Sequence, residues 1–566
     1  MPPASGRGRR PRGPGIVYSV TACVAVLALG AVALSADQAP PPTVAEFAPA
    51  ALDQIEDAPD RQGTNVGEGE TGGEGGGADV SAVPSPSASA LPSPSAAAPV
   101  IDVNRTRKCV GNPPRQTEDP QSPPCVPFFA GDNGGATSLG VTRDEIRVVL
   151  PYGNFLSATS PADYQVLASF FNTRYEFYGR KIRLLPFVAR GDNFANPNPP
   201  DMIADAARVA NEFKAFASIG YTDRRGAEHT YYDELARRKI IAVIGGTAAV
   251  ATEEHLRSRA PYQWSRAMAT DTLLRNLGQF TCAQLSKKAP TYGGPYSFVP
   301  QPTMRKLGIM TTRAPDGTIP DIAPLQAALA GCGERPFSIE APYAEDPRDG
   351  LNPVISMRDQ QVTSIICVCD LGSLRNSYMP SAEGQGYNPE WVLSSYNGND
   401  GDNGFAQAPP AQARRVIGVT VANKTQRNQD HPWFWAYREA GPTRTPPSGA
   451  AGYAMTGVYS TMSLLAAGLQ MAGPNLTPQT FAAALQRTVF PNPGAGAAPF
   501  FQSAVGFAGG THSMIKDAAM YWYDAAQQGT VDPASPGAVC YVRKGQRFGL
   551  GSWPQREPEF RQGPCR

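Results

Sequence analysis

Residues Ala215 to Thr252 read AFASIGYTDRRGAEHTYYDELARRKIIAVIGGTAAVAT, and this stretch decides the fold. It contains two short apolar runs, Phe216–Ile219 and Ile240–Ile244, which stop at Gly220 and at Gly245-Gly246. Such short apolar runs bounded by glycine are typical of buried parallel strands, and the polar segment between them has apolar positions at helical spacing. The stretch therefore predicts a strand–helix–strand unit of a parallel sheet.

Two loops in this unit are candidates for ligand binding. In open α/β sheets, ligands bind beside the loops that follow the carboxyl ends of the strands. Glycine allows the backbone to approach a ligand closely, and threonine, aspartate and arginine offer hydroxyl groups and charge. An ordinary strand–helix–strand unit with polar turns explains the same residues, so the unit alone does not establish a site. The loops are Gly220-Tyr221-Thr222-Asp223-Arg224 and Gly245-Gly246-Thr247-Ala248.

The totals limit the class of protein. A chain of 566 residues is longer than one hydrophobic core usually supports, so several domains are expected. Its 50 basic side chains nearly balance its 49 acidic ones, so no global field would attract nucleic acid. The 57 glycines and 56 prolines exceed an average share, which indicates either disorder or many turns.

The N-terminus predicts export. Four arginines between Arg7 and Arg12 precede an apolar run from Ile16 to about Ser35, close to the ~20 residues that cross a bilayer. Residues 1–36 are therefore a signal peptide, with a candidate cleavage site at Leu34-Ser35-Ala36, or an uncleaved membrane anchor. The sequence before Cys23 also resembles a lipobox, although apolar residues follow this cysteine. All three interpretations place the rest of the chain outside the cytoplasm.

Residues 37–130 are expected to be a disordered linker. They are rich in proline, serine, alanine and glycine and have few aromatic side chains, so they cannot bury enough apolar surface to offset the entropy of ordering. Such a segment would act as a tether between the membrane and a folded body that begins near Gly140.

The cysteines support export. Apart from Cys23 there are eight, and an even number in an exported chain predicts disulfides, of which we expect at least two, although the connectivity stays open. Cys367 and Cys369 lie two apart in one predicted strand, where they are core or disulfide residues, because no two further zinc ligands are visible nearby. The other candidate partners are Cys109 with Cys125, Cys540 with Cys565, and Cys282 with Cys332.

Strand and helix patterns alternate from Gly140 onward and predict two doubly wound parallel-sheet lobes. Two late helical segments, at 431–440 and 450–473, look like parts of a lobe already begun, so the chain is expected to cross between the lobes more than once. The predicted first lobe comprises residues 140–266 with 422–513, and the second comprises 267–421 with 514–530. Residues 531–566 are predicted to be a C-terminal extension.

The order of these features resembles the type I extracytoplasmic solute-binding proteins, specifically the branched-chain amino-acid-binding class of ABC transporters. The resemblance covers roughly residues 140–530 and rests on the order and spacing of weak motifs. These motifs are Gly140-Val141-Thr142, Tyr178-Gly179-Arg180-Lys181, Arg208-Val209-Ala210-Asn211 before Ser218-Ile219-Gly220, Ile244 to Thr252, Pro261-Tyr262-Gln263, Leu464 to Leu469 and Gly510-Thr511-His512-Ser513.

The resemblance implies a ligand between the lobes. The family's small-small-Thr loop, which binds the ligand's carboxylate and ammonium groups, corresponds to Gly245-Gly246-Thr247. Its serine after the preceding strand falls on Arg224, which favours an anion, and its acidic residue falls near Asn397. An Arg224 that points out of the cleft would remove the anion argument. The predicted ligand-binding residues are Tyr152, Asn154, Phe155, Tyr221, Thr222, Asp223, Arg224, Gly245, Gly246, Thr247, Asp370, Leu371 and Asn397.

The predicted function is capture of a small polar, amino-acid-like or carboxylate ligand for an ABC permease, without catalysis, cofactor or metal. A membrane-tethered sensor with the same lobes is an alternative, because the fold does not determine the output. A secreted α/β hydrolase is a weaker alternative, since the chain has no G-x-S-x-G, H-E-x-x-H or Walker motif. Of the four histidines only His229 is near a predicted ligand loop, and there we expect it to be exposed.

Overall fold

The computed structural model describes residues 109–555 and Cys565, except for 113, 117–118, 120, 153–155, 157, 192–197, 222–228, 246–250, 315–316, 491–502 and 532. The predicted leader at residues 1–36 and the linker up to residue 108 lie outside the described residues. Within the described part of the chain, no helix combines the length and the apolar character needed to cross a membrane.

The first lobe is built on a five-stranded, all-parallel sheet with the strand order β4-β3-β5-β6-β7. The predicted unit at residues 215–252 forms its centre, with β5 and β6 as neighbours and α5 between them in sequence. The strands are β3 (Glu145–Tyr152), β4 (Lys181–Val188), β5 (Ala217–Ile219), β6 (Ile241–Ile244) and β7 (Gln263–Ser265).

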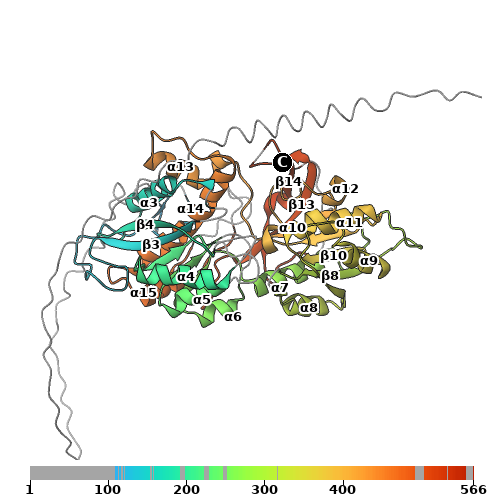
Figure 1. The fold of residues 1–566 in the computed structure, drawn as a ribbon, viewed down its shortest axis with the longest axis horizontal. Helices are drawn as coiled ribbons and strands as arrows, with labels where there is room; N and C mark the ends of the chain where they lie inside the picture. Colours follow the sequence, from blue (N-terminus) through green and yellow to red (C-terminus); the bar gives the residue numbers. More distant parts are fainter. Residues whose placement is uncertain are drawn as a thin grey trace, which may run out of the picture. The chain divides into compact units, whose positions relative to one another are not determined.

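Helices cover both faces of this sheet (Figure 1). Val148 and Val149 are adjacent on β3 and both are 0% exposed, because Val148 packs toward α3 and α14 and Val149 toward α4 and α5. Burial on both faces explains why the inner strands β5 and β6 are continuous apolar runs. The helices of this lobe are α3 (Pro161–Arg174), α4 (Pro199–Asn211), α5 (Thr230–Arg237), α6 (Glu253–Ser258), α13 (Pro432–Ala440), α14 (Gly449–Ala472) and α15 (Pro478–Arg487).

Local signals define the ends of these helices. The side chain of Ser160 accepts a hydrogen bond from the Asp163 N–H at the start of α3, where Pro161 takes the first helical position. Thr477 and Thr480 form a reciprocal capping box at the start of α15. The long helix α14 ends at Gly473, whose φ of 84° favours glycine.

The second lobe contains an eight-stranded mixed sheet with the order β14-β13-β12-β11-β10-β8-β9 and β15 paired to β13. Strands β8 to β12 are parallel, and β13 and its partners β14 and β15 are antiparallel. The strands are β8 (Leu307–Thr312), β9 (Phe337–Ala341), β10 (Ser364–Val368), β11 (Glu390–Leu393), β12 (Val416–Thr420), β13 (Asp517–Gln528), β14 (Pro536–Tyr541) and β15 (Arg547–Gly549). The predicted α/β class with two doubly wound sheets is confirmed.

Helices connect the parallel strands of this sheet. Helix α7 continues into one π-helical turn, and a second π-helical turn lies between α10 and α11. The helical elements are α7 (Thr270–Phe280), η2 (Thr281–Leu285), α8 (Ala323–Ala330), α9 (Leu351–Asp359), α10 (Leu371–Ser373), η3 (Leu374–Tyr378), α11 (Met379–Gly384), η4 (Tyr396–Gly398), α12 (Pro410–Ala413), η5 (Asn428–Asp430) and η6 (Val542–Gly545).

The chain passes between the two sheets after β7, after β12 and before β13. Ser265 and Ser513, on the first and third of these crossovers, form a parallel bridge. Arg547 donates hydrogen bonds to the carbonyl groups of Val421 and Ala422 and to Asp517, so one buried side chain joins the second and third crossovers. Because β14 and β15 complete the second sheet, the predicted C-terminal extension at 531–566 is in large part a component of that sheet.

The segment before the first lobe is also folded. Strands β1 (Cys109–Val110) and β2 (Arg115–Gln116) pair, and Gln121 and Ser122 are buried. Gln121 Nε2 donates to Ser503 O (3.0 Å), 382 residues away in sequence. The predicted end of the linker at residue 130 falls inside this packed segment, so the described folded body begins at Cys109. Polar side chains such as Gln116 and Gln121 make contacts here, and an argument from composition that considers only apolar burial does not detect them.

Four disulfides join the eight cysteines, which confirms the expectation of at least two. They are Cys109–Cys125, Cys282–Cys332, Cys367–Cys369 and Cys540–Cys565.

Candidate functional site

Each sheet has one switch point, where the chain leaves neighbouring parallel strands in opposite directions. In the first sheet it lies between β3 and β5, and in the second between β8 and β10. Loops at such points form the usual ligand-binding crevice of open α/β sheets. The described residues there are Tyr152 and Gly220-Tyr221 in the first lobe, and Thr312 and Asp370 in the second.

The predicted first-lobe residues that the structure describes are Tyr152, Tyr221 and Gly245. Tyr152, at the end of β3, is half-buried and packs against the main core cluster. The structure also describes Gly220, Tyr221 and Gly245. The remaining predicted residues of this lobe lie outside the described residues, namely Asn154, Phe155, Thr222, Asp223, Arg224, Gly246 and Thr247.

Tyr221 has a different environment from the one predicted. Its side chain is 3% exposed, and its ring stacks on Tyr231 of α5 with centroids 3.8 Å apart and 7° between the planes. Tyr232 O–H donates to the Tyr221 carbonyl, and its ring lies edge-on to the Tyr221 ring. The side chain, predicted to bind the ligand, is therefore part of the core between the sheet and its helices. Aromatic stacking with a helix later in the chain produces this placement.

The glycines of the predicted loops have packing roles. A Cβ on Gly245 would lie 2.7 Å from the Thr461 methyl carbon of α14, and one on Gly220 would lie 2.6 Å from Leu150. Gly220 also has a φ of +83°, a backbone conformation that residues other than glycine rarely adopt. Gly245 therefore lets its loop approach α14, and Gly220 lets its loop approach Leu150 of β3, in addition to any role with a ligand.

The second-lobe residues are placed at the carboxyl ends of β10 and β11. Asp370 N–H donates to Thr312 Oγ1 (3.2 Å), and its carboxylate Oδ1 accepts from Ser373 N–H (3.0 Å). Leu371 is half-buried and packs against the core of this lobe. Asn397 is half-buried, with φ 50° and ψ 28°, a left-handed conformation that asparagine tolerates. Asp370 therefore lies at the switch point, and Asn397 lies on the loop after the adjacent strand.

A buried carboxylate beside these residues is not among the predicted ones. Asp400 accepts hydrogen bonds from the hydroxyl groups of Ser395 and Thr420, at the ends of β11 and β12. Ser395 Oγ also accepts from the Val421 N–H (2.8 Å). Burial raises the pKa of Asp400, although these hydrogen bonds act to lower it. A serine and a threonine directly after apolar strands were visible in the sequence, but the aspartate that joins them was not distinguishable from the surrounding polar loop.

A second polar cluster lies around Asp233 on α5. The carboxylate of Asp233 accepts from His255 Nε2 (3.0 Å), Arg259 (2.8 Å) and Gln263 Nε2 (2.9 Å). Burial acts to raise its pKa, but these three partners lower it well below the usual range. The cluster joins the first turn of α5 to α6 and to the first residue of β7.

His229 belongs to this cluster and is not exposed as predicted. It is half-buried, with its ring centroid 4.1 Å from that of His255. Burial, together with the neighbouring His255, lowers the pKa of His229 to about 4. An open groove of about 550 Å³ next to the cluster is lined by Asp233, Ala236, Arg237, Ser258, Arg259, Ala260 and Tyr262.

Among the residues that the structure describes, no group of three or more His, Cys, Asp or Glu side chains could hold a metal ion. The histidine ring nitrogens with hydrogen bonds contact Asp233, the Trp433 N–H and the Gln263 carbonyl. In this part of the chain, no imidazole is hydrogen-bonded to a serine or cysteine side chain.

No protein-family model matches this chain, and no curated protein sequence matches it. Several solved structures are similar to this chain. A solute-binding protein of an ABC transporter from Rhodopseudomonas palustris BisB5, in complex with 3,4-dihydroxybenzoic acid, is 13% identical with a TM-score of 0.47, covering 72% of this chain and 97% of its own. A branched-chain amino acid ABC transporter protein from Thermus thermophilus with bound valine is 12% identical with a TM-score of 0.49, covering 72% and 97%. A fatty acid ABC transporter substrate-binding protein from Thermomonospora curvata is 13% identical with a TM-score of 0.47, covering 75% and 97%.

Proposed function

We propose that this protein is an extracytoplasmic solute-binding protein that captures a small polar ligand between its two lobes for an ABC importer. The observation that carries the proposal is the presence, in one chain, of two doubly wound sheets, one all-parallel and one mixed, joined by three crossovers. A ligand that contacts both lobes shifts the balance toward a closed state, because only that state gives it both sets of contacts.

The ligand would be anchored on the first lobe. Gly245, Gly246 and Thr247 would present backbone and hydroxyl groups, and Arg224 with Thr222 would bind a carboxylate. An arginine–carboxylate pair is strong because it is charge-assisted and bidentate. The resemblance to type I solute-binding proteins supports this assignment.

The second lobe would supply Asp370 and Asn397. The contacts of Asp370 with Thr312 and Ser373 fix its backbone and one carboxylate oxygen, so the group is held in place before a ligand arrives. Such preorganisation reduces the entropy that binding must offset.

Three features support a location outside the cytoplasm. The charged N-terminus with its apolar run is typical of export signals. The folded body contains four disulfides, which are characteristic of oxidising compartments. The third is the proline- and serine-rich sequence between the leader and the body, which suits a tether.

A ligand screen tests the proposal. Thermal unfolding would be measured with amino acids, aromatic acids, dicarboxylic acids, amides and polyols, since a ligand at ~100 Kd adds about 2.7 kcal/mol to the stability of the folded state. We expect at least one carboxylate-bearing compound to raise the Tm and to be confirmed by calorimetry.

Variants assign the hit to the cleft. Arg224→Ala should weaken binding by about ten- to a hundredfold, the equivalent of about 1.5–3 kcal/mol for a charge-assisted hydrogen bond, and Thr247→Ala should weaken it less. Arg237→Ala is the control, because this arginine is exposed in the groove beside Asp233. The Arg237→Ala variant should bind the ligand as tightly as the parent does. A confirmed ligand that bound the Arg224 and Thr247 variants as tightly as the parent would show that the cleft assignment is wrong.

A further inference from the structure

A disulfide ends strand β10 directly before Asp370. Cys367 and Cys369 are separated by one residue, and their Cα atoms are 5.1 Å apart. Two residues of extended chain span ~6.6–7 Å, so the chain is shortened where it leaves the strand after Val368. The pairing of β10 with β8 stops at Val368 opposite Thr311. The bridge therefore ends the strand and directs the chain into α10, which Asp370 caps.

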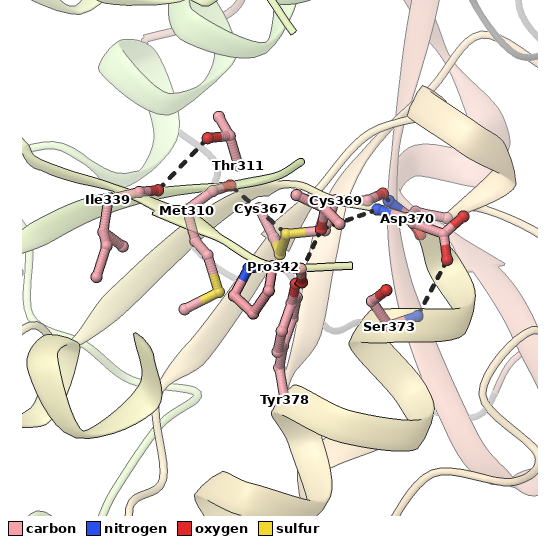
Figure 2. The surroundings of a disulfide bond; sticks show 11 residues. Met310, Thr311, Ile339, Pro342, Cys367, Cys369, Asp370, Ser373 and Tyr378 are labelled. Atoms are coloured by element: carbon pink, nitrogen blue, oxygen red, sulfur yellow. Dashed lines mark hydrogen bonds between the residues drawn. A yellow bond between two sulfur atoms is a disulfide. The ribbon is translucent and has the colours of Figure 1, made fainter. Parts of the chain in front are cut away.

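The surroundings hold this bend in place (Figure 2). Both cysteines are 0% exposed, and Cys369 Sγ lies 3.5 Å from the Met310 carbonyl oxygen. Asn399 Nδ2, from the loop after β11, donates to the Cys369 carbonyl (2.7 Å). Asp370 N–H donates to Oγ1 of Thr312, the last residue of β8, so the bend is attached on both sides, to β8 and to the loop after β11.

The bend also sets the direction of the Asp370 carboxylate. Oδ1 accepts the Ser373 N–H (3.0 Å), while Oδ2 points away from Ser373 in Figure 2 and has no hydrogen-bond partner in the described part of the chain. The residue is half-buried. An ionised carboxylate only accepts hydrogen bonds, so the group that Oδ2 can bind is a donor.

We propose that the Cys367–Cys369 disulfide is a positioning element for Asp370, and that Asp370 Oδ2 accepts a hydrogen bond from a hydroxyl or ammonium group of the ligand. This inference rests on the proposed solute-binding function and narrows its ligand class. The ligand class that this contact selects is one with a hydroxyl or ammonium donor, such as an amino acid or a hydroxy acid.

A purely stabilising role would fit this disulfide poorly. The entropy that a disulfide removes from the unfolded chain grows with the length of the loop it closes. This bridge closes a loop with a sequence separation of 2, against 50 for Cys282–Cys332 on the opposite face of the same sheet. The shorter bridge therefore contributes little to global stability, and its effect is local.

The first test uses ligand-free full-length protein. Amide hydrogen exchange at 370–373 would be compared between the parent and the Cys367→Ala/Cys369→Ala variant. We expect exchange at least tenfold faster there, with the amides of β11 unchanged, while the control Cys282→Ala/Cys332→Ala leaves 370–373 as in the parent. Equal exchange in the parent and the Cys367→Ala/Cys369→Ala variant would overturn the positioning role.

The second test uses probe pairs that differ only in the donor group, 4-hydroxybenzoate with benzoate and valine with 3-methylbutanoate. We expect the parent to bind the donor-bearing member of at least one pair at least tenfold more tightly. The Cys367→Ala/Cys369→Ala variant should lose most of that preference while its affinity for the donor-free member is unchanged. A preference that persists in this variant would show that the disulfide is structural only.

Two further variants keep the test decisive. Asp370→Asn retains an oxygen for the Ser373 N–H but loses the charge, so its preference for the ammonium-bearing probe should fall. Thr312→Val removes the acceptor of the Asp370 N–H, so it should also speed exchange at 370–373. This variant replaces the Cys367→Ala/Cys369→Ala variant in the exchange test if that variant does not fold. If no probe binds the parent, the proposed function and the donor recognition both fail for these ligands, whereas the exchange result still decides the positioning role.

Discussion

The buried ion pair between Arg305 and Glu390 should be essential to the stability of the second lobe. Their side chains are 3% and 0% exposed. Glu390 Oε2 accepts from Arg305 Nε (2.7 Å) and from the Ser364 hydroxyl, and Oε1 accepts from Arg305 Nη2 (2.9 Å) and Tyr292 N–H (2.9 Å). The pair joins the segment before β8 to the amino ends of β10 and β11, opposite the edge with the candidate site.

Removal of one partner leaves a charge buried without its counter-ion. Arg305→Met or Glu390→Gln should therefore lower the free energy of unfolding of this lobe by about 3–5 kcal/mol. Since the remaining partner is already uncompensated after the first change, the double variant should lose less than the sum of the two single variants, by about 1–3 kcal/mol. The exposed pair Arg313–Glu340 is the matched control, with side chains 47% and 53% exposed. Arg313→Met should change stability by less than about 1 kcal/mol.

Hydrogen exchange of the β10 and β11 amides gives the stability of this lobe without assuming that both lobes unfold together. A loss of about 3–5 kcal/mol corresponds to amides that exchange roughly a hundred to several thousand times faster, since each 1.4 kcal/mol is tenfold. A change below about 1 kcal/mol in Arg305→Met, or a double variant that loses the full sum, would refute the reasoning. Because the pair is at the amino edge, ligand affinity in the surviving folded protein should be unchanged.

Two other predictions follow from single side chains. His431 Nδ1 accepts the Trp433 N–H (3.3 Å) at the start of α13, and burial with the nearby Arg266 lowers its pKa to about 3. This pKa is below the unfolded value of ~6.5, so stability is complete above pH ~6.5 and should fall by up to about 1.4 kcal/mol per pH unit as the pH decreases toward 3. His431→Asn keeps a capping oxygen but does not titrate, so the difference in unfolding free energy between pH 7 and pH 5, measured by urea titration, should be smaller than in the parent. An equal difference in the variant and the parent would contradict this prediction. The Asp402 carboxylate accepts hydrogen bonds from the backbone N–H groups of Thr530, Val531 (3.3 Å) and Val539 (3.0 Å). Asp402→Ala should therefore lower the free energy of unfolding by about 1.5–3 kcal/mol and speed amide exchange in β14. Asp402→Asn should have a smaller effect on both. Protection of β14 as in the parent would show that the hairpin does not depend on this carboxylate.

The sequence by itself determined the strands and most helices of both lobes. The apolar runs at the inner strands β5, β6, β8, β10 and β12 are visible because a parallel strand covered by helices on both faces must be apolar along nearly its whole length. Glycines and helix caps mark where these runs end, which is enough to give the order of elements and hence the α/β class. The position of Asp370 at the switch point follows from the same pattern, since it is the first polar residue after the apolar strand β10.

Only the tertiary structure decided which distant segments meet. The pairing of β14 and β15 with β13, the docking of Gln121 on Ser503, and the buried Asp400 between Ser395 and Thr420 all depend on contacts between parts of the chain that are far apart in sequence or on different strands. The stack of Tyr221 on Tyr231 likewise depends on how α5 folds back on the sheet. Hydrophobic periodicity reports whether a residue faces a core, and it does not encode the partner that the residue meets there. Polar side chains are the least predictable, because the same aspartate or glutamine is stable in water or in a buried site that satisfies its hydrogen bonds.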